Sequence, residues 1–109
     1  MSDRDAAPAG LSTEAREWWR RITAEFELDA GGLLVLGAAL ESFDRAAEAR
    51  ALIAVEGLTV EGRYGPRAHP MVAVERDARA AMVRGLKSLG LELEPILAPG
   101  RPAGGRRAN

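Results

Sequence analysis

Apolar residues recur along positions 11–28 with the three- and four-residue spacing of an amphipathic helix. This first stripe consists of Leu11, Ala15, Trp18, Trp19, Ile22 and Phe26. Ser12 is a favourable helix N-cap, and Glu14 would face the positive end of the helix dipole. The pattern therefore predicts a first helix that begins near Ser12.

A second, longer helix is predicted after the short interruption "LDAGG" at positions 28–32. Asp29 can cap it, Gly57 can end it, and the short gap favours a helical hairpin. Its main stripe is Leu33, Leu36, Leu40, Phe43, Ala47 and Ala51, and its apolar surface continues through Leu52, Ile53 and Val55. The abundant alanine predicts close packing against another helix.

The segment "LTVEGRYGPRA", residues 58–68, has β-branched and aromatic residues on either side of glycine-containing pairs. It predicts a short β-hairpin or an extended turn. A lone hairpin is marginal in water, so we expect it to lean on the helices or on the hairpin of a neighbouring subunit.

A third helix is predicted to open at Pro70, which suits the first helical position, with His69 as its N-cap. Its stripe is Met71, Val74, Ala78, Ala81, Met82, Leu86 and Leu89, and Gly90 ends it. Gly85 within this helix costs about 1 kcal/mol relative to alanine unless a neighbouring backbone needs the space.

These elements predict one mainly α domain: a helical hairpin plus a third helix, with the short β-hairpin or extended turn between helices two and three. The 109 residues allow a single small domain. We expect a flexible leader over 1–10, a helical domain over 11–95 that forms homo-oligomers, and a basic flexible tail over 96–109.

Composition narrows the function classes. The chain has no cysteine, which excludes a disulfide scaffold and cysteine-ligated zinc and fits a reducing cytoplasm. The start shows no secretory signal, and the apolar run at 33–40 is too short to span a bilayer, so no membrane partner is expected.

Candidate chemistry is sparse. There is no phosphate-binding loop and only one histidine, and the pairs Asp44–Glu48 and Glu41–Asp44 are typical of a solvated helix face. His69 has no orienting acid nearby in the sequence, so His69 and Pro70 are interpreted as a structural turn and cap. We expect no catalytic residue, no metal, no cofactor and no enzymatic activity.

Charge is unevenly distributed although the net formal charge is only −1. Residues 28–62 carry six acidic and two basic side chains, whereas residues 63–87 carry six basic and two acidic ones. This asymmetry would suit subunits that pair head to tail, or a basic face on one side; an uneven solvated surface is the alternative.

Two groups of side chains allow both a structural and a nucleic-acid interpretation. Trp18 and Trp19 point about 100° apart on a helix, so one belongs in the core and the other at a helix or subunit interface, unless the pair stacks on bases. Two arginine sets could hold phosphates or be solvated faces: Arg16, Arg20 and Arg21, and Arg76, Arg79 and Arg84.

The order of these features resembles the phage terminase small subunit family. The resemblance covers about residues 11–95 and rests on Leu11, Ser12, Glu14, Ala15, Trp18, Ile22, Gly57, Pro70, Leu89, Gly90, Leu91 and Pro95. His69 stands where members usually carry asparagine, and "LGLELEP" is two residues longer and more acidic than the usual closing segment.

The resemblance implies a ring-type homo-oligomer that recognises viral double-stranded DNA and brings it to the large terminase subunit, in the cytoplasm of a bacterial host. It implies DNA contacts at Arg16, Arg20, Arg21, Arg101, Arg106 and Arg107. The expected subunit contacts are Trp19, Leu36, Leu40, Phe43, Leu58, Val60 and Tyr64. The alternatives are a transcription regulator of helix-turn-helix type and a structural adaptor without DNA contact.

Overall fold

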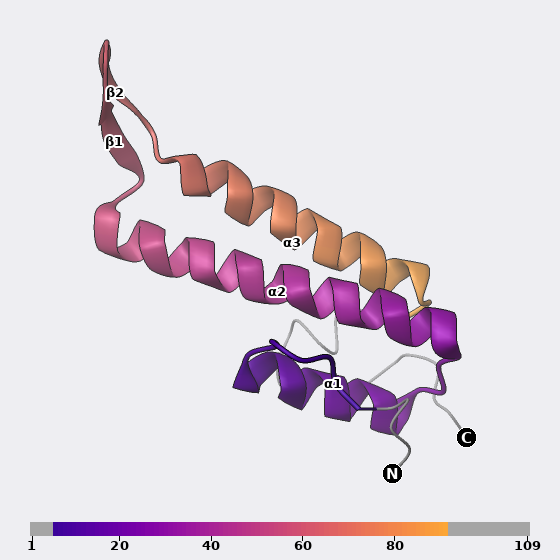
Figure 1. Ribbon diagram of the computed structural model, residues 1–109. Coiled ribbons are helices and arrows are strands. Elements are labelled where there is room, and N and C mark those ends of the chain that lie inside the picture. The colour runs from indigo at the N-terminus through magenta and orange to yellow at the C-terminus, as the bar shows by residue number, and fades with distance from the viewer. Residues whose placement is uncertain (1–5, 92–109) are drawn as a thin grey trace.

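The computed structural model describes residues 6–91, which form three helices and one β-hairpin. The elements are α1 (Thr13–Glu25), α2 (Ala30–Glu56), β1 (Thr59–Gly62), β2 (Gly65–Ala68) and α3 (Pro70–Ser88). Helix α2 runs through the middle of the molecule, with α1 along one side and α3 along the other (Figure 1). The predicted mainly α fold, with a two-stranded sheet between the second and third helices, is confirmed.

Local capping residues set where α1 and α2 begin and end. Ser12 Oγ accepts the N–H of Ala15 at 3.0 Å, and Asp29 Oδ1 accepts that of Gly32 at 2.8 Å. Gly57 follows α2 with a φ of 90°, a conformation that glycine adopts without strain. Helix α2 has 27 residues and is therefore about 40 Å long.

The buried face of α2 changes direction along its length. Leu33, Leu36 and Leu40 are buried in the first half, as the stripe predicted, but Ala46 and Ala49 are buried in the second half. The predicted positions there were wrong: Ala51 is exposed and Ala47 is half-buried. The reason is that α1 covers only the first part of α2, so the second part buries the side that faces α3 (Figure 1).

Helices α2 and α3 pack closely because small residues line their contact. A Cβ atom placed on Gly85 would lie 3.2 Å from the Cβ of Ala39. Ala39 and Ala78 are both buried. The space left by Gly85 is thus taken by α2, which accounts for a glycine inside α3.

The β-hairpin extends away from the helices at the end of the molecule where α2 stops and α3 starts (Figure 1). Its strands are antiparallel, with Thr59 opposite Ala68 and Gly62 opposite Gly65. Arg63 and Tyr64 form the tip, and Gly65 closes the turn with a φ of 116°. At the base, the N–H of His69 donates to the carbonyl of Leu58 at 2.8 Å.

The packed chain begins before Leu11. Ala7 packs against the core, and a Cβ atom on Gly37 of α2 would lie 3.1 Å from Cγ of Pro8. Residues 7 and 8 of the expected flexible leader are therefore seated on α2. At the other end Leu91 is buried, and the expected tail, 96–109, lies outside the described residues.

Candidate functional site

Within residues 6–91, no group of three or more His, Cys, Asp or Glu side chains is placed to hold a metal ion. Every buried side-chain nitrogen or oxygen in this part of the chain has a hydrogen-bond partner. A buried polar atom left unpaired is often a sign of a reactive or ligand-binding site. Exposed charged and apolar side chains are the candidate contacts that this part of the chain offers.

His69 joins the end of α2 to the start of α3. Its ring is buried, its Nδ1 accepts the N–H of Met71 at 3.0 Å, and its Nε2 lies 2.6 Å from Oε1 of Glu56. Since Nδ1 accepts a hydrogen bond, Nε2 carries the proton and donates it to Glu56. Both ring nitrogens are engaged, and Pro70 follows as the first residue of α3. His69 and Pro70 therefore cap α3 and connect it to the hairpin.

Glu56 is the orienting acid that sequence reasoning did not find for His69. The two residues are separated by the hairpin but meet because an antiparallel hairpin returns the chain to its starting point. The predicted hairpin between the two helices could have indicated this contact, because a hairpin places the last turn of α2 beside the first turn of α3.

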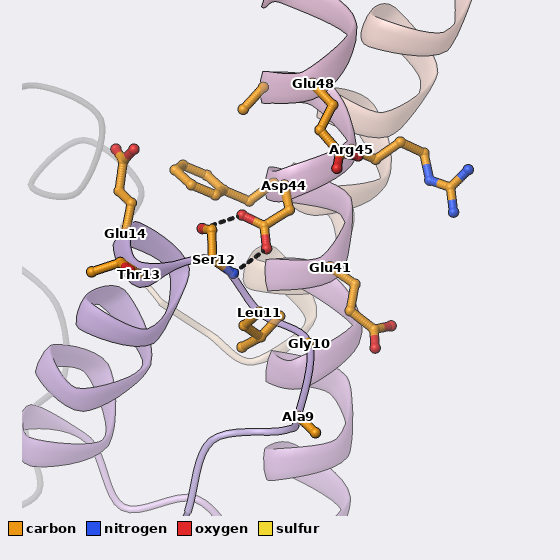
Figure 2. A pocket seen from close by; sticks show the side chains of 12 residues that line it. Ala9, Gly10, Leu11, Ser12, Thr13, Glu14, Glu41, Asp44, Arg45 and Glu48 are labelled. Carbon is orange, nitrogen blue, oxygen red and sulfur yellow. Dashed lines mark hydrogen bonds between the residues drawn. The ribbon is translucent and has the colours of Figure 1, made fainter.

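A shallow groove lies between the beginning of α1 and the middle of α2 (Figure 2). Asp44 forms its centre: its carboxylate accepts the backbone N–H of Ser12 at 2.8 Å and the Ser12 hydroxyl at 2.5 Å. This contact fastens the start of α1 to α2. The groove has four carboxylates and one arginine, together with a partly apolar wall: Glu14, Glu41, Asp44, Glu48, Arg45, Leu11, Phe43 and Ala47.

The other carboxylates of the groove are differently placed from Asp44. Glu14, Glu41 and Glu48 are exposed, and none of them has a hydrogen bond or ion pair to another residue in the described part of the chain. Figure 2 shows Glu14 rising from α1 and Glu41 and Glu48 extending from α2 on either side of Asp44. The groove therefore presents three carboxylates that have no ion pair among residues 6–91.

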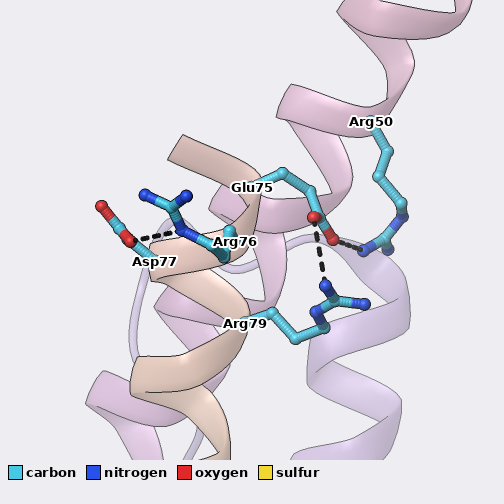
Figure 3. Close-up of polar contacts among 5 residues, drawn as sticks. All are labelled: Arg50, Glu75, Arg76, Asp77 and Arg79. Atoms are coloured by element: carbon cyan, nitrogen blue, oxygen red, sulfur yellow. Dashed lines mark hydrogen bonds and ion pairs between the residues drawn. The ribbon is translucent and has the colours of Figure 1, made fainter. Parts of the chain in front are cut away.

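Glu75 crosslinks α2 and α3 (Figure 3). Its side chain is 13% exposed; Oε2 lies 3.3 Å from Nη1 of Arg50, and Oε1 lies 3.6 Å from Nη2 of Arg79. Arg76 pairs with Asp77 at 3.3 Å. Two of the three arginines predicted as a possible phosphate set on this helix are thus in ion pairs, whereas Arg84 is exposed and has none among residues 6–91.

The arginines of α1 are all engaged locally. Arg16 is half-buried and its Nε donates to the carbonyl of Leu11 at 3.3 Å. Arg20 pairs with Glu17 at 2.5 Å. The guanidinium of Arg21 lies 4.6 Å from the ring centre of Trp18. Arg20 and Arg21 remain exposed on the outer face of α1, whereas Arg16 is held against the chain.

The two tryptophans have separate environments. Trp19 is 3% exposed and lies in the core, while Trp18 is half-buried and covered on one face by Arg21. The burial of Trp19 agrees with the prediction that one of the two tryptophans belongs in the core. With its ring face occupied by a guanidinium, Trp18 is a poor platform for stacking bases.

The expected subunit contacts divide into two groups. Trp19, Leu36 and Leu40 are buried within the single chain, at 3%, 0% and 3% exposure, so their side chains have no surface left for a second subunit. We correct that part of the expectation. The error arose because a stripe of large apolar residues does not reveal whether it packs inside the chain or between chains.

The remaining four expected contacts reach the surface. Phe43 and Val60 are half-buried, whereas Leu58 and Tyr64 are 67% and 94% exposed. Leu52 and Val55, at the end of α2, are also exposed. We call this end of the molecule the distal apolar end, defined by Leu52, Val55, Leu58 and Tyr64.

No helix in the described residues is long and apolar enough to span a bilayer.

Comparison with protein families gives a match over most of the chain. A family model described as phage terminase, small subunit, matches residues 15–94, which is most of the chain and includes α2, the hairpin, α3 and all but the first two residues of α1. No curated protein and no solved structure matches the chain significantly.

Proposed function

Because the chain belongs to the phage terminase small-subunit family, we propose that it forms a homo-oligomer that binds viral double-stranded DNA and recruits or regulates the large terminase subunit during genome packaging. The family match over residues 15–94 carries this proposal, since it supports a packaging role. Small subunits are generally non-catalytic, and the ATPase and nuclease reside in the large subunit. The site of action would be the cytoplasm of the bacterial host.

Self-assembly is supported by the distal apolar end. Isolated two-stranded hairpins are marginally stable in water, and this one has strands of four residues that extend beyond the helices. Its Tyr64 is 94% exposed, and Val55 in the last turn of α2 is 84% exposed. Clustered exposure of large apolar side chains is typical of a protein interface. The interface we propose contains Phe43, Leu58, Val60 and Tyr64, with Leu52 and Val55 added.

DNA contact is assigned in this proposal to exposed arginines. Arg20 and Arg21 are neighbours on the outer face of α1, where they can reach phosphates after exchanging their present partners. Arg101, Arg106 and Arg107 lie outside the described residues and remain a sequence-based prediction. Arg16 is the weakest member, because its guanidinium already donates to a carbonyl and is half-buried.

A regulator of the helix-turn-helix type is disfavoured by the position of α2. A recognition helix must present one free, basic face to the major groove. Helix α2 instead contacts α1 on one side and α3 on another, and its exposed positions include Glu41, Glu48 and Glu56. The adaptor alternative differs from the proposal only in lacking DNA contact, so the experiment below separates the two.

Co-expression with a large terminase subunit tests the proposed function. We expect the two chains to co-purify after nuclease treatment, and we expect DNA to bind the small subunit with an affinity that falls as salt rises. Large-subunit binding without any DNA binding would favour the adaptor. Absence of both would overturn the packaging proposal.

A further inference from the structure

The hairpin tip combines an exposed aromatic side chain with positive charge. The guanidinium of Arg63 lies 5.6 Å from the ring centre of Tyr64, and Tyr64 is 94% exposed. Arg67 lies opposite Val60 in the register, and its side-chain carbons lie against Gly62. Alternation along a strand places Glu61 on the other face. One face and the tip of the hairpin are therefore apolar and cationic.

The α1–α2 groove has the complementary character. Three of its four carboxylates, Glu14, Glu41 and Glu48, are exposed and unpaired within residues 6–91, and the half-buried Phe43 supplies an apolar wall. The groove has a volume of about 830 Å³. An aromatic side chain flanked by two arginines matches such a surface in both polarity and charge.

The hairpin cannot occupy the groove of its own chain in this fold. The groove is centred on Asp44, whereas the hairpin begins after Glu56, twelve residues and about 18 Å farther along α2. The hairpin then adds about 13 Å in the direction away from the helices (Figure 1). The complementary surfaces are thus separated within one chain but free to meet between two chains.

We propose that subunits assemble head to tail, with the Arg63–Tyr64–Arg67 end of one hairpin seated in the α1–α2 groove of the next copy. Tyr64 packs towards Phe43 of the neighbour, and the two arginines offset part of the negative charge of Glu14, Glu41 and Glu48. Such a contact joins two different surfaces, so repeated addition gives a closed ring when the rotation between subunits closes. The inference rests on the homo-oligomer of the proposed function and adds the pair of surfaces that forms it.

Two charge-reversed variants test the pairing. The hairpin variant carries Arg63→Glu and Arg67→Glu, and the groove variant carries Glu41→Arg and Glu48→Arg; all four side chains are exposed and have no ion pair within the described residues. We expect each variant alone to lose assembly, because like charges then face each other. Mixed in equal amounts, the two variants present complementary charges at both junctions, the native hairpin with the native groove and the reversed hairpin with the reversed groove, so light scattering should again give a mass well above the 11.6 kDa of a single chain.

A chain that carries all four substitutions should assemble again to the wild-type mass, because its reversed surfaces are complementary. A matched control, Arg84→Glu with Lys87→Glu, makes the same change in charge on exposed residues of α3 and should leave the mass unchanged. Circular dichroism checks that every variant keeps its helices.

The outcomes separate this inference from the function on which it rests. A wild-type chain with the mass of a single copy at micromolar concentration would overturn the homo-oligomer itself. A wild-type assembly that the groove variant leaves intact, while the hairpin variant breaks it, would overturn the groove as the receiving surface. A mixture of the two variants that stays at single-chain mass would also overturn the head-to-tail pairing.

Discussion

The carboxylate of Asp44 accepts two hydrogen bonds from Ser12, one from its backbone N–H at 2.8 Å and one from its hydroxyl at 2.5 Å, across 32 positions of sequence. The same Ser12 hydroxyl accepts the N–H of Ala15 and so caps α1. One residue therefore performs two tasks: it begins a helix and attaches that helix to α2. The negative charge of Asp44 also lies at the end of α1 where the helix dipole favours it.

Ser12→Ala and Asp44→Ala should each lower the free energy of unfolding by about 1–3 kcal/mol, because each removes hydrogen bonds to a charged or capping group. The double variant should lose less than the sum, with a coupling of at least about 0.5 kcal/mol. Urea unfolding at one fixed protein concentration measures these values. Arg84→Ala, at an exposed position of α3 outside this contact, is the control and should change stability by less than about 0.5 kcal/mol. Strictly additive losses would contradict the coupling.

Gly85 should tolerate no side chain larger than alanine. Gly85→Leu should lower the free energy of unfolding by at least about 1–3 kcal/mol, because a Cβ there is already 3.2 Å from that of Ala39. The control is Gly31→Ala in the first turn of α2, where a Cβ would meet only Oδ1 of Asp29 at 3.6 Å. That change should raise stability by up to about 1 kcal/mol. Thermal unfolding of both variants distinguishes a packing effect from helix propensity.

The two roles of His69 can be separated by two substitutions. His69→Asn retains a side-chain acceptor for the N–H of Met71 but cannot span the same distance to Glu56. His69→Ala removes both contacts. It should lower the free energy of unfolding by about 1–2 kcal/mol more than His69→Asn does. Urea unfolding measures both changes. Equal losses for Asn and Ala would show that the cap contributes nothing and that the contact with Glu56 carries the whole effect.

Features that depend on neighbouring residues were predictable from the sequence. The caps Ser12, Asp29 and His69 act within three residues of their own position, and Gly57 ends α2 through its own backbone conformation. The hairpin followed from the same kind of local evidence. Helix α1 nevertheless ends at Glu25, three residues before the end of the predicted stretch 11–28, because apolar residues continue past the last helical turn. Helix α2 begins at Ala30, before the first stripe residue Leu33, because Asp29 caps it directly.

Features that depend on the arrangement of helices were not predictable. The spacing predicted that one of Trp18 and Trp19 belongs in the core, but only the position of α2 decides that it is Trp19. The shift of the buried face from Leu40 to Ala46 and Ala49 depends on α1 being shorter than α2. The pairs Ser12–Asp44 and Glu56–His69 join residues that no motif links. The acidic groove could therefore not be predicted from the sequence.

DNA binding should weaken when the exposed arginines are removed. Replacing Arg101, Arg106 and Arg107 with alanine, or Arg20 and Arg21 in a second variant, removes positive charge that would otherwise displace counterions from phosphates. Each lost phosphate contact should make the dependence of log affinity on log salt shallower by about 0.9. Titration of labelled duplex DNA at several salt concentrations measures that slope. The control is Arg76→Ala with Arg79→Ala, two exposed arginines of α3 to which the proposal assigns no DNA contact, and it should leave the slope unchanged. Unchanged binding by the triple variant would remove the C-terminal arginines from the proposed DNA surface, and the same result for the Arg20 and Arg21 variant would remove α1.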